Sequence, residues 1–184
     1  GRGVGMTDAE IDATPTTNWE DVFFRTGQTI NHVLSFSQGG KKSSTYTSLG
    51  YFSQEGVLKG TSLKRFTFRN NLNGSSENGK FNYNTTLTAN YSTSNLPDDV
   101  GSFGVSTNIF YGANASLPYI SPDDYTNGTD LANEPFSLAL TPLYLIDRLS
   151  NFEFLEEEVK IVAGFSADYE LVQNLTARIS LGVD

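Results

Sequence analysis

Few residues in this sequence carry the chemistry of catalysis or metal binding. His32 is the single histidine and cysteine is absent, so neither a Ser/His/Asp set nor a His/Cys metal cluster can be assembled. His32 shares one face of a strand pattern with Ile30, Leu34 and Phe36, which is typical of a strand residue near a membrane interface. The three acids at 156–158 resemble paired carboxylates, but neighbouring side chains of an extended segment diverge. We expect a protein that is not an enzyme and needs no cofactor.

One polar segment has the ligand types of a calcium site. Residues 123–130, Asp-Asp-Tyr-Thr-Asn-Gly-Thr-Asp, combine hard oxygen ligands with a glycine turn. The acids do not follow the spacing of an EF-hand loop, and a plain polar turn accounts for the same residues. We therefore expect a polar turn and no bound metal.

Recognition chemistry is better represented than catalysis. Between residues 95 and 150, aromatic rings are interspersed with Asn, Asp and Ser, and rings beside amides and carboxylates suit sugars or peptides. The candidate substrate-binding residues are Tyr111, Tyr119 and Tyr125. The alternative is that these rings pack within the segment itself.

Six segments alternate apolar and polar residues with a period of two, which is the pattern of strands with two different faces. They are residues 28–38, 43–53, 63–73, 80–93, 159–170 and 175–183. In the fourth, Phe81, Tyr83, Leu87 and Tyr91 alternate with Asn, Thr and Ser. The sequence therefore predicts an all-β protein built as an antiparallel meander of six strands.

The two faces of these segments differ strongly in polarity. The apolar side of the fourth segment has aromatic residues at both ends, like the girdles of membrane barrels, and the other side is too polar for a dry core. We expect one common, convex apolar face that includes Phe66, Phe68, Phe81, Tyr83, Leu87, Tyr91, Ile161, Phe165 and Tyr169. Arg65, Arg69 and Arg178 fall on the polar side, and we expect them to face a barrel lumen or a plug.

The connections alternate in length. Those at 39–42, 74–79 and 172–174 are short, whereas 54–62 is longer and 94–158 is very long. Tight turns on one side and long loops on the other are typical of an open segment of a transmembrane β-barrel. Two alternatives are a soluble β-sandwich and a small self-contained barrel, although six strands fall below the usual minimum of about eight.

Composition and charge exclude other classes. The 12 basic and 21 acidic residues give a net charge of −9 at pH 7, which argues against nucleic acid as a partner. No segment approaches the roughly 18 consecutive apolar residues of a membrane helix. The sequence begins in loop-like residues and ends directly after a strand pattern, so we expect it to be cut from a longer protein.

Several ordered segments resemble one family, the SusC/RagA-like TonB-dependent transporters. Asn-Trp-Glu-Asp-Val-Phe-Phe-Arg-Thr-Gly at 18–27 is similar to its DWxDxxFRTG segment, and the residues that follow it at 31–40 fit as well. The segments at 46–56, 64–72, 169–175 and 180–184 resemble its YxxSLGYxxQEG, KRYxxRxNL, YxIxxGL and SLGxD segments. Asn18 departs from the usual Asp, and Asn174 from the usual Gly.

The resemblance implies a fold and a function. The chain would be a partial β-barrel domain carrying roughly strands two to seven of about 22. Residues 1–27 would form an extracellular loop with short helical turns, 28–93 four strands, 94–158 a long extracellular loop, and 159–184 two strands.

The family imports glycans or peptides across the outer membrane of Gram-negative bacteria. The partners it implies are a SusD-like surface lipoprotein, outer-membrane lipid, and the TonB complex, which acts through a plug outside these residues. The function alternative is a secreted β-sandwich that serves as an adhesion or carbohydrate-binding module.

We predict that residues 1–184 alone aggregate in water. The expected edge strands, 28–38 and 175–183, would leave unpaired backbone groups that template further pairing. The apolar face would also exceed the roughly 300–600 Å² that soluble monomers expose. Expression without detergent and a mass measurement in solution test this, and a monodisperse, cooperatively unfolding monomer would favour the sandwich.

Overall fold

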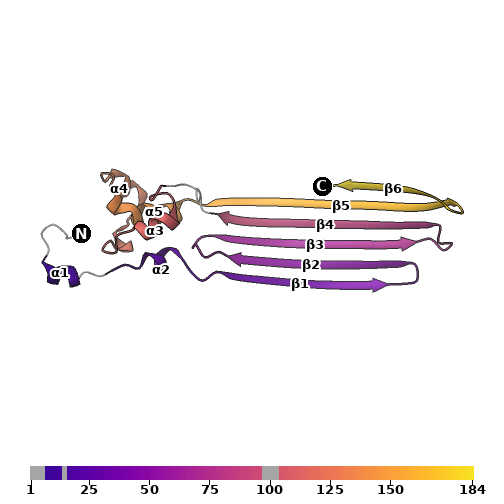
Figure 1. Ribbon diagram of the computed structural model, residues 1–184, viewed down its shortest axis with the longest axis horizontal. Coiled ribbons are helices and arrows are strands. Elements are labelled where there is room, and N and C mark those ends of the chain that lie inside the picture. Colours follow the sequence, from indigo (N-terminus) through magenta and orange to yellow (C-terminus); the bar gives the residue numbers. More distant parts are fainter. Residues whose placement is uncertain (1–6, 14–15, 97–103) are drawn as a thin grey trace. The chain divides into compact units, whose positions relative to one another are not determined.

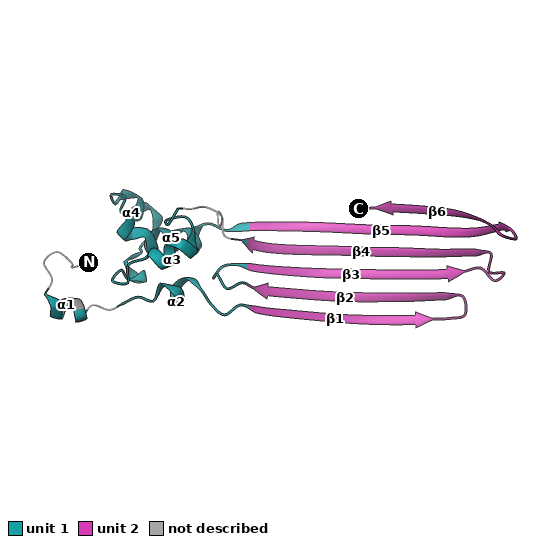
Figure 2. Ribbon diagram, viewed as in Figure 1, with its two compact units in different colours: residues 1–27, 56–61, 96–154 teal, residues 28–55, 62–95, 155–184 magenta. Residues whose placement is uncertain are grey.

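The computed structural model describes residues 7–13, 16–96 and 104–184, so small parts of the expected loops 1–27 and 94–158 lie outside the described residues. The chain divides into two compact units (Figure 2). The sheet unit consists of Gln28–Glu55, Ser62–Asn95 and Leu155–Asp184. The helical unit consists of the segments Gly1–Gly27, Gly56–Thr61 and Leu96–Phe154.

The sheet unit is a six-stranded antiparallel meander (Figure 1). Its strands, in order across the sheet, are β1 (Gln28–Gly39), β2 (Ser43–Glu55), β3 (Ser62–Ser75), β4 (Phe81–Leu96), β5 (Phe154–Val172) and β6 (Leu175–Val183). Each strand is hydrogen-bonded to its neighbours in sequence, so β1 and β6 lie at the two edges of an open sheet. The predicted fold class is confirmed.

Two strands extend beyond their sequence patterns. β4 continues to Leu96 instead of ending at 93, and β5 begins at Phe154 instead of 159. The acids at 156–158 therefore lie in a strand, where alternation separates their side chains. The Tyr91 hydroxyl donates a 3.3 Å hydrogen bond to the Glu157 carboxylate, while the acids on either side project from the other face. A run of acids has no apolar alternation, which is why the strand start was missed.

The strand register brings the apolar residues to one side of the sheet, the apolar face. Residues directly opposite each other in a ladder project from the same side, as Leu49, Phe68 and Ala89 do across β2, β3 and β4. The contact between Tyr91 and Glu157 places the odd-numbered residues of β5 on this side too. The expected common face is thus confirmed, and its convexity stays a prediction.

Two tight turns use residues in the left-handed region. Gly79 has φ 71° in the connection from β3 to β4, and Asn174 has φ 66° in the connection from β5 to β6. The register also shifts between Glu170 and Val172, so an irregularity in β5 lies next to the second turn. Asn174 stands where the family usually has glycine, and asparagine tolerates this conformation better than most residues.

Among its described residues, the helical unit contains five short α-helices: α1 (Asp8–Ala13), α2 (Trp19–Phe23), α3 (Ile109–Ala115), α4 (Gly128–Asn133) and α5 (Thr141–Asn151). Two 3₁₀ turns, η1 (Pro122–Asp124) and η2 (Leu138–Leu140), connect them. None of the helices in the described part of the chain has the length and apolar character needed to cross a bilayer. Three of these helices and both 3₁₀ turns lie within residues 94–158, the segment that was expected to be a long loop.

Three separate stretches of chain build the core of the helical unit. Its buried residues are Trp19, Phe23, Leu58, Ile109, Ala113 and Leu145. Trp19 and Phe23 lie one turn apart on α2, and their rings stack with centroids 5.6 Å apart. The Asn18 side chain caps α2 by accepting from the Glu20 backbone N–H, which explains why asparagine can replace the usual aspartate.

We predict that the effect of a substitution at Asn174 on stability depends on how well the new residue tolerates a positive φ. Asn174→Gly should retain or slightly raise the free energy of unfolding, whereas Asn174→Val should lower it by about 1–2 kcal/mol, because a β-branched residue resists positive φ. Denaturant midpoints of the detergent-folded protein measure both. Gln173→Val, at the neighbouring turn position without positive φ, is the matched control, and equal losses at the two positions would contradict the prediction.

Candidate functional site

The side of the sheet opposite the apolar face, the polar face, is built from amides, hydroxyls and a few charges. Directly opposed residues across β2, β3 and β4 include Ser48, Arg69 and Thr88, and Asn73 stands opposite Asn84. Such groups are stable when they meet water or polar protein and costly when they are buried without partners. The polar face is therefore suited to an aqueous or polar-packed interior.

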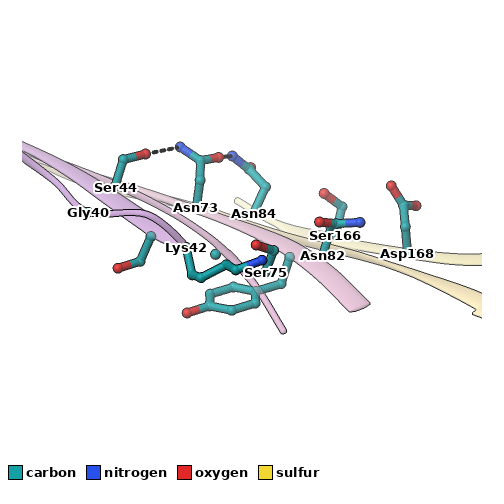
Figure 3. Close-up of a pocket in the computed structure, with 12 residues that line it drawn as sticks. Gly40, Lys42, Ser44, Asn73, Ser75, Asn82, Asn84, Ser166 and Asp168 are labelled. Atoms are coloured by element: carbon teal, nitrogen blue, oxygen red, sulfur yellow. Dashed lines mark hydrogen bonds between the residues drawn. The ribbon is translucent and has the colours of Figure 1, made fainter. Parts of the chain in front are cut away.

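A depression of about 430 Å³ lies on this unit where β2, β3 and β4 approach their short turns. Figure 3 shows Ser44, Asn73 and Asn84 side by side, one from each strand. Asn84 donates to the Asn73 side-chain oxygen, and the Asn73 amide lies 3.5 Å from the Ser44 hydroxyl. These amides and hydroxyls can donate and accept hydrogen bonds, and Lys42 and Asp168 also line the depression, so it suits a polar surface or ligand.

Alternation and register place the three predicted arginines on the polar face. Arg178 stands opposite Asp168 and binds it through two hydrogen bonds, Nε to Oδ1 at 2.6 Å and Nη2 to Oδ2 at 3.2 Å. The guanidinium carbon of Arg65 lies 5.3 Å from the centre of the Phe52 ring, a cation–π contact. That these arginines face a lumen or a plug stays a prediction.

The apolar face is extensively exposed. Leu34 is 72% exposed, Ile161 52% and Leu181 63%, and aromatic residues such as Phe66 and Tyr91 are also open. Tyr51 and Phe66 pair across β2 and β3 with their ring centroids 4.9 Å apart. A continuous apolar surface of this kind is unfavourable in water and matches the lipid-facing band of a membrane barrel.

The three candidate tyrosines have different environments in the helical unit. Tyr111 and Tyr119 are exposed, whereas Tyr125 is half-buried and engaged with its own unit. The Tyr125 hydroxyl donates to Asp147 Oδ1 at 2.6 Å and accepts from the Asn151 amide at 2.8 Å. The rings of Tyr111 and Tyr119 are open to solvent and therefore accessible to a ligand. Their role in substrate binding stays a prediction.

Sequence reasoning missed one aromatic pair. Phe136 and Tyr144 stack with centroids 5.8 Å apart, and Phe136 is 71% exposed. The two residues come together only because η2 and the start of α5 fold between them, so no local spacing pattern predicts the pair.

The predicted polar turn at 123–130 is organised by its own side chains. The Ser121 hydroxyl caps η1 by accepting from the Asp123 backbone N–H, and the Ser121 backbone N–H donates to the Asp124 carboxylate. Asn127 caps α4 by accepting from the Asp130 backbone N–H. Within the described residues, no group of three His, Cys, Asp or Glu side chains is placed to hold a metal ion.

Comparison with known proteins gives short sequence matches. No family model matches the chain. A protein named TonB-dependent receptor P3 from Formosa agariphila is 37% identical over 62 residues, which are 34% of this chain and 6% of that protein. TonB-dependent receptor SusC from Bacteroides thetaiotaomicron is 37% identical over 73 residues, 39% of this chain and 7% of that protein. The matches thus span a small fraction of these relatives.

Comparison with solved structures covers nearly all of the chain. The structure named the RagAB peptide transporter matches with a TM-score of 0.70 and 22% identity, over 91% of this chain and 18% of that chain. The RagAB peptide importer in its closed-closed state matches with the same values. At this identity the likeness shows the fold alone.

We predict that the Tyr125–Asp147 bond weakens in alkaline solution. The hydrogen bond to Asp147 and then burial raise the pKa of Tyr125 above its ordinary value of 10.0. Because the folded-state pKa is the higher one, the stabilisation is fully present below the ordinary pKa and is lost as pH rises through the raised value.

The fluorescence of Trp19, the single tryptophan, reports the stability of the helical unit over this pH range. The wild type should lose stability in alkaline solution, and Tyr125→Phe should remove this loss of stability. Tyr111→Phe, at an exposed ring, should retain it. Identical alkaline profiles for Tyr125→Phe and the wild type would contradict the prediction.

Proposed function

Because this chain is a barrel segment of the SusC/RagA-like class of TonB-dependent transporters, we propose that its protein imports nutrients across the outer membrane of a Gram-negative bacterium. The observation that carries the proposal is the two-faced meander, with an exposed apolar face and a polar face on a RagAB-like fold. A β-sandwich module would need two packed sheets, whereas the described strands form one.

Each face then has a distinct task. The apolar face meets lipid, with Tyr and Phe rings among its aliphatic residues, and the polar face lines the barrel interior. Arg65, Arg69 and Arg178 face the lumen or the plug that fills it. The segments of the helical unit are assigned to the extracellular side, where long connections of such barrels lie.

The proposed substrates are glycans or peptides. A peptide substrate is supported by the likeness in fold to RagAB, which is named as a peptide transporter. A glycan substrate is supported by the exposed rings of Tyr111 and Tyr119, because aromatic faces beside polar groups also suit sugars. The resemblance to SusC/RagA-like transporters supports a SusD-like surface lipoprotein and the TonB complex as partners.

We predict that a charge is tolerated on the polar face and not on the apolar face. Ala89 and Thr86 lie three residues apart on β4 and project from opposite sides, and Thr86 stands opposite the uncharged Asn71. Ala89→Arg should lower barrel stability by about 2–4 kcal/mol, because it places a guanidinium in hydrocarbon, whereas Thr86→Arg should cost far less. Heat-modifiable migration of the membrane-extracted, full-length protein measures the folded fraction, and equal losses would contradict the assignment of the faces.

Energised uptake tests the transport proposal. A strain that lacks the gene should lose uptake of labelled peptides or of labelled oligosaccharides, and a plasmid copy should restore it. A protonophore should abolish that uptake, because TonB draws on the proton gradient of the inner membrane. Unchanged uptake of both substrate classes in the deletion strain would overturn the proposal.

A further inference from the structure

The core of the helical unit joins parts of the chain that are far apart in sequence. Trp19 and Phe23 come from α2, Leu58 from the connection between β2 and β3, and Leu145 from α5. Phe23 and Leu145 are 1% and 0% exposed. Each of the three segments therefore covers apolar surface that the other two would otherwise leave in water.

Backbone and side-chain hydrogen bonds tie α2 to the connection at 56–61. The Arg25 backbone N–H donates to the Val57 carbonyl at 2.7 Å. Its guanidinium spans the base of that connection, with Nε 3.1 Å from the Gly56 carbonyl and Nη2 3.1 Å from the Thr61 carbonyl. The Lys59 N–H adds a bond to the Phe23 carbonyl at 3.0 Å. Arg25 thus fixes both ends of the segment that delivers Leu58.

The same N-terminal stretch is tied to the long segment on its other side. The Thr17 N–H donates to the Pro118 carbonyl at 2.6 Å, and the Thr17 hydroxyl donates to the Ile120 carbonyl at 2.7 Å. The Trp19 indole N–H donates to the Leu117 carbonyl at 2.9 Å. Segment 17–25 is therefore bonded to both of the other two parts of the unit.

Local helix propensity cannot order these parts on its own. Isolated helices shorter than about 12–15 residues are marginal in water. α2 has 5 residues, α3 has 7 and α5 has 11. Close packing at Gly112, where a side chain would collide with the Val105 carbonyl and the Leu145 side chain, further couples α3 to α5. The order of each helix must come from the shared core.

We propose that the helical unit is one cooperative folding unit and that Arg25 is the positioning residue that closes it. By holding the connection at 56–61, Arg25 seats Leu58 against Trp19 and Phe23, and this core orders residues 104–154. The exposed rings of Tyr111, Tyr119 and Phe136 are then displayed from a preformed surface. The idea that these rings are displayed to a ligand rests on the proposed function. The cooperative folding of the helical unit does not depend on it.

Native-state hydrogen exchange of the full chain in detergent tests the proposal. Hydrogen bonds made by charged donors contribute about 1.5–3 kcal/mol, so Arg25→Ala should speed opening of the unit roughly 10- to 100-fold. The same factor should appear at 16–25, 56–61 and 104–154, while strands β2 to β4 keep their protection. Arg25→Lys should give a smaller factor, because an ammonium group cannot reproduce the planar fork of the guanidinium.

Trp19 supplies a second, spectroscopic readout of the same unit. Its emission should shift to the red and become more accessible to acrylamide in Arg25→Ala, and it should recover in part in Arg25→Lys. Arg69→Ala, at a polar-face arginine of the sheet unit, should leave the Trp19 signal unchanged.

A matched pair keeps the test independent of Arg25 itself. Leu58→Ala leaves a cavity in the core and should reproduce the exchange pattern, whereas Val57→Ala, at a neighbouring residue that is 56% exposed, should not. Faster exchange confined to 56–61 would overturn the proposal, because the segments would then open separately. Loss of the sheet together with the helical unit in Arg25→Ala would overturn it as well. A failed transport assay would count against the proposed function and would not change the expected hydrogen-exchange results.

Discussion

Period-two alternation, combined with in-register backbone pairing, is the constraint on which the sheet unit depends. A strand in a membrane barrel has to satisfy its N–H and C=O groups through its neighbours while its side chains meet two different media. Opposed residues such as Leu49 and Phe68 share one side, so a one-residue slip would turn the whole apolar set toward the polar face. Even the acidic start of β5 obeys this rule, because Glu157 alone of its three acids reaches Tyr91.

The helical unit obeys a different constraint, the burial of a small core by helices that are individually too short. Trp19 and Phe23 provide the aromatic centre, and Leu58 and Leu145 close it from two other parts of the chain. One candidate recognition side chain is engaged in hydrogen bonds within the unit. Tyr125 is bonded to Asp147 and Asn151, whereas Tyr111 and Tyr119 remain exposed.

The structure shows what the residues do in one of the segments that resemble the family. Within residues 18–27, Asn18 caps α2, Trp19 and Phe23 form the core, and Arg25 binds the carbonyl groups of 56–61. The two departures from the family pattern preserve the local structure. Asn18 keeps the cap that aspartate would make, and Asn174 keeps the positive φ that glycine would adopt.

The sequence by itself determined the six strands except for the end of β4 and the start of β5, together with their order, their two faces and the polar side on which Arg65, Arg69 and Arg178 lie. The reason is that alternation and turn signals are local properties of neighbouring residues. Only the tertiary structure decided that residues 17–25, 56–61 and 104–154 form one unit, and that Phe136 stacks on Tyr144. Contacts such as that between Thr17 and Ile120 join residues far apart in the chain and leave no periodic trace in it. The short helices between residues 104 and 154 have too few turns to leave a clear periodic pattern in the sequence, and they are ordered by the shared core.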